Sequence, residues 1–587
     1  MNGFVFLERT SLMVCMSQYF SNFLLGIAAI LSLSKGYAQD SILTHATLDL
    51  KNNPPLEIPL RYSGTYGELR PNHFHAGVDL KTQGREGFPI YAVADGFLSR
   101  IKVDTRSYGK VLYLDHPELG TTTVYAHLNR FSPKIQAYIK SEQYLHQTYQ
   151  IQRYLRPNQI PVKRGEIIGY SGNTGNSFGP HLHFEVRDLD SEEPMNPLQF
   201  GLEATDNDPP TIQALYLFES EDPQIVTVFE NRTMISLQTV KERVEYRAMD
   251  TISVQDYYGF GVQSFDRLDL SANKNGWYRL ELMRNDSIVS EIVIDRFNFT
   301  ENPLINKSID YHFYESSNNR ILLTTKEQNN PLGFFKNAPK KELFSAEVGK
   351  IDHWTLVLSD YSDNSSSVHW ITKGINEVKI MTSSKGNMAV NQKVKNRRLE
   401  AQLIAVENSI YSPEMINFSI SEDTLYIGPK DVLVRNPLLL KIIPKELKQQ
   451  SNWFNYAFLG KKGEKGTNFI RKVDSDTLTL NLRNTGDYYF AYDSIAPLII
   501  PRNFSSGQEI NGYRYLEIEA QDQETGIKSF EGHLDGQWIL FEHEPKKNRF
   551  TFDTSDILLI PGVHRLEFEI EDLLGNKSKE TFSITIN

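Results

Sequence analysis

The sequence has 587 residues, which at about 100–200 residues per domain is enough for three to five domains. Hydrophobic residues make up 40% of it and charged residues 23%, close to the averages of globular proteins, so wholesale disorder is excluded. A net charge of −11 provides no basic surface for nucleic acid, and we expect no nucleic-acid partner. The only cysteine, Cys15, lies in a segment that we expect to be removed. Structural disulfides, a thiolate nucleophile and cysteine ligands for zinc are therefore excluded.

Residues 1–38 are predicted to be a signal peptide. Their apolar run, 23–33, is shorter than the roughly 20 residues that a membrane span requires. Gly36 and Ala38 are small residues at the two positions that a signal peptidase reads, so we expect cleavage after Ala38. The alternative is an uncleaved apolar anchor or a buried helix. No later stretch is long and apolar enough to span a membrane, and we predict an exported protein that is periplasmic, held in the cell envelope or secreted.

Residues 40–200 are predicted to form a small antiparallel, all-β domain. Runs such as 89–93, 111–114 and 121–125 alternate apolar with polar residues and are rich in β-branched and aromatic side chains, which is typical of strands. Glycines separate these runs and favour turns between them.

One helix is expected inside this domain, over about residues 133–155. Ser132 suits an N-cap and Pro133 suits the first helical position. Apolar residues follow at partly helical spacing, and Pro157 bounds the segment. Its charged residues are mostly basic.

Similar segments recur in the C-terminal two thirds of the chain. The runs 206–210 and 493–497 have related beginnings, and the segments 358–365 and 570–578 each indicate a strand, a polar turn and another strand. We predict two β-sandwich, immunoglobulin-like modules of one type, although common turn chemistry could produce the same similarity by coincidence. The predicted domains are a β-sandwich module with insertions at 206–375, a β-rich middle domain at 376–490 and a C-terminal immunoglobulin-like module at 491–587.

Histidine is concentrated in three short segments, 72–79, 125–128 and 179–185. In the last of them, His181 and His183 belong to a predicted strand, where residues two apart share one face at roughly 6.5–7 Å. That spacing suits one imidazole on a metal ion and the other beside it. Spacing alone does not decide which histidine is the ligand.

His75 and Asp79 lie four residues apart, a separation of about 13 Å in a straight strand and too far for two ligands of one zinc ion. We therefore expect His75 in a loop and Asp79 at the start of a strand, with a bend at Gly77. Two imidazoles and one carboxylate make a three-ligand set, and catalytic zinc sites keep a fourth position for water. His127 and the spare member of the His181/His183 pair suit proton transfer near neutral pH.

Over roughly residues 55–200, the sequence resembles the LytM/lysostaphin-type zinc endopeptidases. The resemblance rests on His75-x-x-x-Asp79, on His127 in Tyr-Ala-His-Leu and on His181-x-His183. It implies that His75, Asp79 and His183 bind one zinc ion per chain. It also implies that His127 and His181 are catalytic, flanking the bound water to assist its deprotonation and to stabilise the oxyanion. The expected substrate is a peptide bond in a peptidoglycan stem or cross-link.

The predicted helix departs from compact members of that family, which have a short link at this point. It is expected to be either a lid or groove wall over the site, or a packed surface decoration. Two other functions use the same fold: a non-enzymatic regulator that activates another cell-wall hydrolase, and a peptidase that acts on proteins. The β-sandwich tail is expected to offer a surface for a protein or cell-surface partner.

Overall fold

The computed structural model describes most of the chain after residue 46. The described residues are 47–71, 73–202, 205–220, 232–269, 271–310, 313–314, 317–326, 330, 332–337, 343–375, 389–406, 409–410, 416–428, 433–445, 456–463, 466–473 and 477–587. The predicted signal peptide lies outside them. Within these ranges, no helix combines the length and the apolar character needed to cross a membrane.

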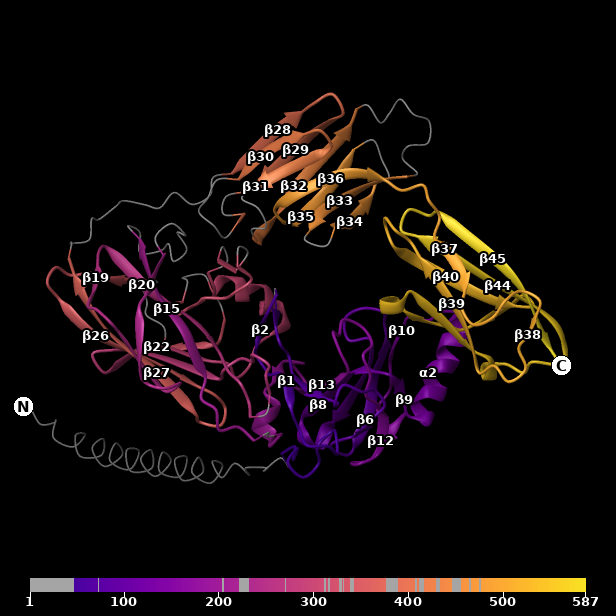
Figure 1. The fold of residues 1–587 in the computed structure, drawn as a ribbon, viewed down its shortest axis with the longest axis horizontal. Helices are drawn as coiled ribbons and strands as arrows, with labels where there is room; N and C mark the ends of the chain where they lie inside the picture. The colour runs from indigo at the N-terminus through magenta and orange to yellow at the C-terminus, as the bar shows by residue number, and fades with distance from the viewer. Residues whose placement is uncertain are drawn as a thin grey trace, which may run out of the picture.

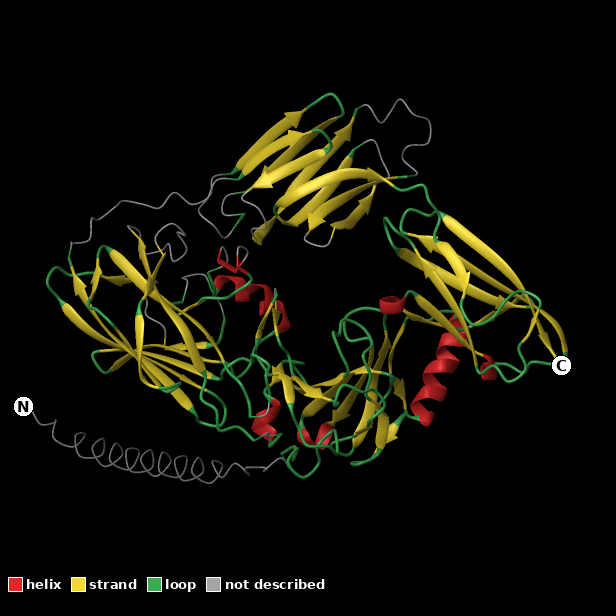
Figure 2. Ribbon diagram, viewed as in Figure 1, coloured by secondary structure: helices red, strands yellow, loops and turns green. Residues whose placement is uncertain are grey.

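The protein is built mainly from β-strands, as the sequence predicts (Figure 2). Its parts follow one another around a ring, in which the N-terminal part lies between the sheets that carry β15 and those that carry β45 (Figure 1). The short 3-10 helices are η1 (Pro117–Leu119), η2 (Pro197–Phe200), η4 (Phe299–Lys307), η7 (Pro545–Lys547) and η8 (Thr554–Asp556).

The N-terminal part consists of a large antiparallel sheet covered by a small one. The large sheet has the order β1 (Tyr62–Gly64), β4 (Val78–Lys81), β13 (His181–Asp188), β8 (Thr121–Leu128), β7 (Lys110–His116), β6 (Gly96–Val103) and β10 (Ile151–Tyr154), with β11 (Pro161–Val162) beside β6 and β14 (Pro194–Met195) beside β13. The small sheet has the order β5 (Pro89–Tyr91), β12 (Ile167–Tyr170) and β9 (Arg130–Phe131), and a separate pair is formed by β2 (Leu69–Arg70) and β3 (His73–Phe74). The predicted antiparallel domain is confirmed.

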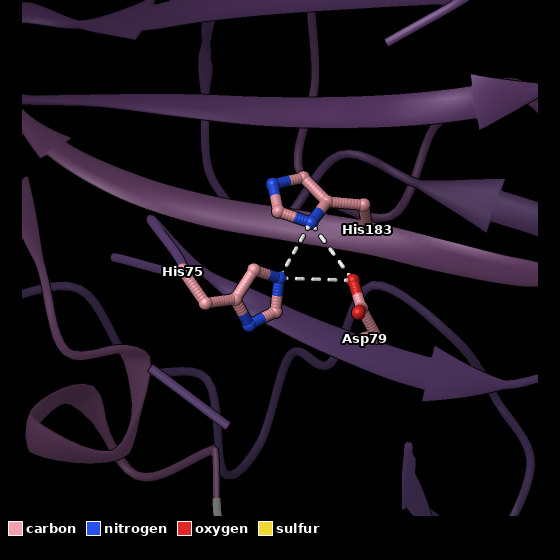
Figure 3. Close-up of side chains that lie close together, drawn as sticks. All are labelled: His75, Asp79 and His183. Atoms are coloured by element: carbon pink, nitrogen blue, oxygen red, sulfur yellow. Dashed lines mark hydrogen bonds and ion pairs between the residues drawn. The ribbon is translucent and has the colours of Figure 1, made fainter. Parts of the chain in front are cut away.

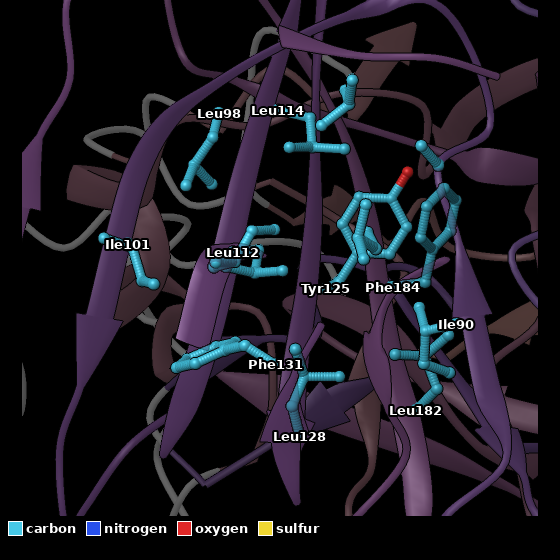
Figure 4. Packing of buried hydrophobic residues seen from close by; sticks show 14 of the residues in the cluster. Ile90, Leu98, Ile101, Leu112, Leu114, Tyr125, Leu128, Phe131, Leu182 and Phe184 are labelled. Atoms are coloured by element: carbon cyan, nitrogen blue, oxygen red, sulfur yellow. The ribbon is translucent and has the colours of Figure 1, made fainter. Parts of the chain in front are cut away.

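The core of this part lies between the two sheets. Leu182 and Phe184 of β13 point into it beside Tyr125 of β8, and Ile90 of the small sheet lies next to them, while Phe131 lies next to Leu128 (Figure 4). Burying each such side chain contributes about 1.5–3 kcal/mol. Because side chains alternate along a strand, His183, which lies between Leu182 and Phe184, points to the opposite face of the sheet.

The helix is shorter than predicted. α2 spans Pro133–His146, with Ser132 as N-cap and proline at the first position as expected, but it ends at Gln147, whose φ of 47° is left-handed. The Gln143 side chain then donates to the carbonyl of Tyr149 and turns the chain back, so the next residues form β10 on the edge of the large sheet. The prediction of a helix to residue 155 was wrong because apolar residues of a strand continued the helical spacing by chance.

Two sheets follow the N-terminal part in the region 205–375. One has the order β16 (Arg232–Ile235), β15 (Thr211–Ser220), β20 (Tyr257–Phe265) and β23 (Leu322–Leu323), with β25 (Phe344–Ser345) beside β20. The other has the order β17 (Leu237–Lys241), β18 (Glu245–Ala248), β27 (Ser365–Gly374), β26 (Ile351–Ser359), β21 (Arg279–Arg284), β22 (Ser287–Val293) and β24 (Phe335–Asn337), with β19 (Ile252–Val254) beside β27. Side chains of both sheets share one hydrophobic cluster, which is the packing of a sandwich.

Two further sheet pairs complete the chain. The first contains β28 (Val390–Lys395), β29 (Leu399–Ala405), β32 (Leu433–Pro444) and β35 (Leu478–Asn484), packed on β30 (Asn417–Ser421), β31 (Thr424–Gly428), β36 (Gly486–Tyr492), β33 (Ala457–Gly463) and β34 (Gly466–Lys472). The last contains β37 (Leu498–Pro501), β39 (Tyr515–Gln521), β43 (Arg549–Asp553) and β42 (Phe541–Glu544), packed on β38 (Gln508–Glu509), β45 (Lys577–Ile586), β44 (Gly562–Asp572), β40 (Ile527–Leu534) and β41 (Gln537–Ile539). The predicted domain limits and the immunoglobulin-like assignment stay predictions.

Equivalent hydrogen bonds occur within the 206–375 module and within the 491–587 module. The side chain of Asn364 donates to the carbonyl of Asp206 at 3.1 Å, and that of Asn576 donates to the carbonyl of Asp493 at 3.0 Å. In each case the same amide also donates to an aspartate four residues before it. The repeated segments seen in the sequence therefore occupy corresponding places.

Candidate metal centre

Three side chains on the outer face of the large sheet meet at one point (Figure 3). His75 Nε2 lies 3.1 Å from Asp79 Oδ1 and 3.0 Å from His183 Nδ1, and the distance from His183 Nδ1 to Asp79 Oδ1 is 2.8 Å. All three residues are buried. The structure thus brings together the three residues that the sequence predicts as metal ligands.

Strand register explains this arrangement. Asp79 of β4 and His183 of β13 are direct partners across two hydrogen-bonded antiparallel strands, so their side chains leave the sheet side by side. His75 lies in the loop before β4, as expected. A Cβ on Gly77 would lie 2.2 Å from the carbonyl oxygen of Phe184, so only glycine allows the loop to pass this close to β13.

The outer nitrogen of each histidine ligand is held by an acceptor. His75 Nδ1 lies 2.8 Å from the carbonyl oxygen of Thr65, and His183 Nε2 lies 2.8 Å from Glu185 Oε1. When both rings are neutral, donation at these positions leaves the lone pair of His75 Nε2 and that of His183 Nδ1 directed into the triangle, where a metal ion could accept them. The loop that carries His75 is fixed further by Phe74, which packs edge-on against Phe334 of the following module.

This donor set fits a metal ion. Zinc bonds to nitrogen and oxygen at about 2.0–2.2 Å in a tetrahedron, which places neighbouring ligand atoms about 3.3 Å apart. The three observed separations are shorter by only a few tenths of an ångström, so the side chains need little movement to hold an ion. Two imidazoles and one carboxylate could hold a metal ion here.

The pKa values of the three residues show which of them carry a proton when no metal ion is bound. Burial lowers the pKa of His75 to about 4, so its imidazole is neutral. Burial acts in the same direction on His183, but hydrogen bonds to Asp79 and Glu185 overcome it and raise the pKa of His183 to about 9. Against the effect of burial, His75 and hydrogen bonds from His181 and His183 hold the pKa of Asp79 well below its usual range. A bound metal ion would replace the proton on His183, because ligands bind metal in their deprotonated form.

His127 and His181, which the resemblance implies to be catalytic, lie beside the triangle. Their rings are 4.8 Å apart between centroids, and His181 Nε2 lies 3.4 Å from Asp79 Oδ1. Each Nδ1 lies 2.8 Å from a carbonyl oxygen, that of Thr174 for His127 and that of Gly179 for His181. Donation from Nδ1 leaves Nε2 of both rings able to accept a proton.

The backbone at His127 is strained. Its φ of 59° lies in the left-handed region, which costs a non-glycine residue about 1–3 kcal/mol and is often found at functional sites. The pairing of β7 with β8 is irregular beside it, between Lys110 and Leu112. This bulge re-aims the His127 ring out of the regular alternation of the strand.

The sequence did not reveal the groups that support the centre. Tyr108 donates to Glu185 Oε1 at 2.5 Å and stacks on the His183 ring, with centroids 5.1 Å apart. Arg187 binds the other oxygen of Glu185 at 2.6 Å. Burial would raise the pKa of Glu185, but Arg187 and His183 lower it to about 2, so this acceptor stays ionised. The i+2 spacing of His183, Glu185 and Arg187 along one strand face was the available signal.

Arg70 and the remaining histidines of the domain lie outside the triangle. Arg70 binds Asp79 Oδ2 at 2.6 Å. His116 is buried and hydrogen-bonded to Thr123, which makes it a core residue. His73 and His146 are exposed.

A cleft of about 530 Å³ lies between the N-terminal part and the C-terminal module. Thr174, which holds His127, lines it, as do Lys140 of α2 and Glu542 of β42. The helix is fixed to the C-terminal module, since Lys140 pairs with Asp556 at 2.5 Å and Tyr144 packs edge-on against Trp538 at 5.3 Å. α2 is therefore a wall of this cleft and an interface with that module.

The N-terminal part matches a known peptidase family. Residues 73–157 and 142–197 match the profile of peptidase family M23. The chain is 34% identical over 128 residues to the DD-carboxypeptidase/endopeptidase Mpg of Neisseria meningitidis, covering 22% of this chain and 23% of that protein. It is 32% identical over 100 residues to the peptidoglycan DD-endopeptidase ShyA of Vibrio cholerae, covering 17% of each.

The catalytic domain of the antimicrobial peptidase lysostaphin from Staphylococcus simulans is a similar solved structure, with 23% identity, 24% of this chain and 91% of that chain covered, and a TM-score of 0.19. The chain spans less than a quarter of the length of the two curated relatives. All five histidine and aspartate positions of the centre fall inside the matched residues. The chain carries a domain of peptidase family M23.

Proposed function

We propose that this chain is a zinc-dependent endopeptidase that hydrolyses peptide bonds in the stems or cross-links of peptidoglycan. The observation that carries the proposal is the buried triangle of two imidazoles and one carboxylate with two further histidines beside it. The substrate class is supported by the names of two relatives, a DD-carboxypeptidase/endopeptidase and a peptidoglycan DD-endopeptidase. The predicted signal peptide supports export to the cell wall.

In this proposal, His75, Asp79 and His183 hold the zinc ion. When bound, zinc would polarise the scissile carbonyl group and lower the pKa of a water molecule toward 7. Thr65 and Glu185 orient the two imidazoles, and Arg70 holds the second oxygen of Asp79, so one oxygen remains for the metal. These contacts keep the ligand atoms in place before substrate arrives.

His127 and His181 carry the proton transfers. Because Nδ1 of each ring is held by a carbonyl oxygen, each Nε2 can accept the proton that the attacking water loses and return it to the leaving amine. A protonated ring can also donate a hydrogen bond to the carbonyl oxygen as that oxygen gains negative charge. The two histidines are 4.8 Å apart between centroids, so both reach the same substrate group.

Two other functions remain as alternatives. A non-enzymatic regulator of another hydrolase needs no complete metal centre, whereas this chain keeps three candidate ligands and two further histidines together. A peptidase for protein substrates would use the same centre and differ only in the bond that it cuts. A protein or cell-surface partner of the β-sandwich tail stays a prediction.

The test is digestion of purified peptidoglycan by the protein without its signal peptide, with mass spectrometry of the products. Wild-type protein should release peptides cut at one type of bond, and a chelator should stop the reaction until zinc is restored. His183→Ala should lose both bound zinc and activity, by about 10²-fold or more, because it removes one of three ligands. The matched control is His146→Ala, an exposed histidine on α2.

Each result separates the candidates. If His183→Ala digests cell wall as fast as wild type, the metal mechanism is wrong. If the wild-type protein binds zinc but cuts only protein substrates, the peptidoglycan assignment is wrong and the peptidase assignment stands. If it cuts neither but activates another hydrolase, the regulator alternative is correct.

A further inference from the structure

A second group of candidate ligands lies where the 206–375 module meets the M23 domain. A cavity of about 40 Å³ at this junction is lined by Asp206, Asp266 and Asp360, and by Thr65 of the M23 domain. One carboxylate oxygen of each aspartate lies within 4.8 Å of the other two. A single water molecule needs about 10–15 Å³ of such space, so the cavity has room for an ion and water.

Asp266 has a carboxylate oxygen with nothing to bind. The residue is 2% exposed, and its Oδ1 makes no hydrogen bond within the described part of the chain. Among the described residues, no lysine, arginine or histidine forms an ion pair with any of the three aspartates. Buried carboxylates without a cation or donor are unfavourable, so the protein alone leaves this group incomplete.

We propose that Asp206, Asp266 and Asp360 bind one calcium ion at the junction between the 206–375 module and the M23 domain. The ligand atoms are all oxygens, which suits a hard cation, and no histidine takes part, which disfavours zinc. Calcium bonds to oxygen at about 2.3–2.6 Å, so two ligands on opposite sides of one ion are about 4.6–5.2 Å apart. The three aspartate oxygens all lie within 4.8 Å of one another, which is compatible with this spacing.

The charges of the aspartates agree with the geometry. Burial and the charge of Asp360 raise the pKa of Asp206 to about 7, and burial together with Asp206 and Asp360 raises that of Asp266 to about 8. Three negative charges are therefore poorly tolerated here without a cation.

The C-terminal module contains the corresponding group, but there neutral donors satisfy it. Asp493, Asp522 and Asp572 also bring their oxygens within 4.8 Å. Thr525 Oγ1 donates to Asp493 Oδ2 at 2.8 Å, and the amides of Thr525 and Gly526 donate to Asp522 Oδ2. No hydroxyl within the described residues donates to Asp266 in this way. The two groups can therefore be compared: hydrogen-bond donors satisfy Asp493 and Asp522 in the C-terminal cluster, whereas Asp266 Oδ1 in the junction cluster has none among the described residues.

Thr65 connects the cavity with the metal centre. Thr65 lines the cavity, its hydroxyl accepts a hydrogen bond from the amide of Gly276 at 3.0 Å, and its carbonyl holds His75 Nδ1. Ordering Thr65 would therefore steady one candidate zinc ligand. This consequence rests on the proposed function, whereas calcium binding itself does not.

The test uses the protein without its signal peptide, loaded with zinc except in His183→Ala, and titrated with CaCl₂ in a calorimeter and in thermal unfolding, with MgCl₂ in parallel. Wild type should bind calcium with a Kd of about 10⁻³ M or tighter, and more tightly than magnesium. Its Tm should rise by about 3–6 °C at a calcium concentration ten times the Kd. Asp266→Asn should lose at least about tenfold in calcium affinity, yet be as stable as wild type without calcium, because the buried carboxyl group that it replaces is costly to ionise there.

Three further variants decide the location. Asp206→Asn should repeat the loss, and it replaces Asp266→Asn if that variant fails to fold. Asp522→Asn and His183→Ala should keep the calcium affinity of wild type, since they alter the C-terminal cluster and the zinc centre. No calcium binding by wild type up to about 10 mM, unchanged affinity in both Asp266→Asn and Asp206→Asn, or loss of binding in His183→Ala would each overturn the proposal.

Discussion

The histidine–aspartate centre and the aspartate cluster at the module junction each bring three candidate ligands together, but they are supported differently. In the centre, Asp79 and His183 stand on paired strands, and each ligand has its own hydrogen-bonded partner behind it. In the cluster, Asp206 precedes β15, while Asp266 and Asp360 directly follow β20 and β26. Side chains at strand ends can close around an ion, whereas side chains on paired strands hold fixed positions for chemistry.

The centre also contains residues for proton transfer, which the cluster lacks. His127→Ala and His181→Ala should each lower kcat for peptidoglycan hydrolysis by about 10²–10⁴-fold, because each removes a positioned proton acceptor. Bound zinc should stay at one ion per chain, since neither residue belongs to the triangle. The measurements are initial rates and zinc content by atomic absorption. Loss of zinc in either variant would mean that this histidine also holds the metal ion, and that metal binding and proton transfer are not carried by separate residues.

The centre also differs from the cluster in the residues that hold its ligands from behind, such as Glu185 behind His183. Glu185→Gln should weaken zinc binding about 10–100-fold, because the carboxylate that orients His183 is replaced by a neutral amide. The measurement is a competition titration against a zinc-binding dye. Arg187→Gln is the matched control, since it disturbs the same buried ion pair but leaves the carboxylate on His183. If both variants lose zinc equally, Glu185 acts only through stability.

Much of the centre followed from local sequence patterns. Strand alternation and residue spacing placed Asp79 on a strand, His75 in a loop, and His181 and His183 on one face. The resemblance then chose His183 as the ligand, and its side chain completes the triangle. The carbonyl oxygens of Thr65 and Thr174 were not predictable, since any residue supplies a carbonyl and only the folded chain shows which one faces a histidine.

Contacts between residues far apart in the chain could not be predicted from the sequence either. Phe74 lies inside the histidine motif, yet its ring packs in the core of the following module. Asp206 was assigned only to a repeated segment at the start of a module, because Asp266 and Asp360 lie far from it in sequence and only the sandwich brings them together. The end of α2 at Gln147 was missed because a single left-handed residue stops a helix without changing the apolar pattern around it.

The smallest predicted effect tests whether neutral donors complete the C-terminal cluster. Thr525→Val keeps the shape of a buried side chain but removes the hydroxyl that binds Asp493 Oδ2, so it should destabilise the C-terminal module by about 1–3 kcal/mol in thermal or urea unfolding. The exposed substitution Thr581→Val should change stability by less than about 0.5 kcal/mol. Calcium should restore part of the stability that Thr525→Val loses, because the variant leaves a carboxylate oxygen unpaired, as at Asp266. An unchanged stability would show that the hydroxyl does not complete this cluster, and the contrast between the two modules would then need another cause.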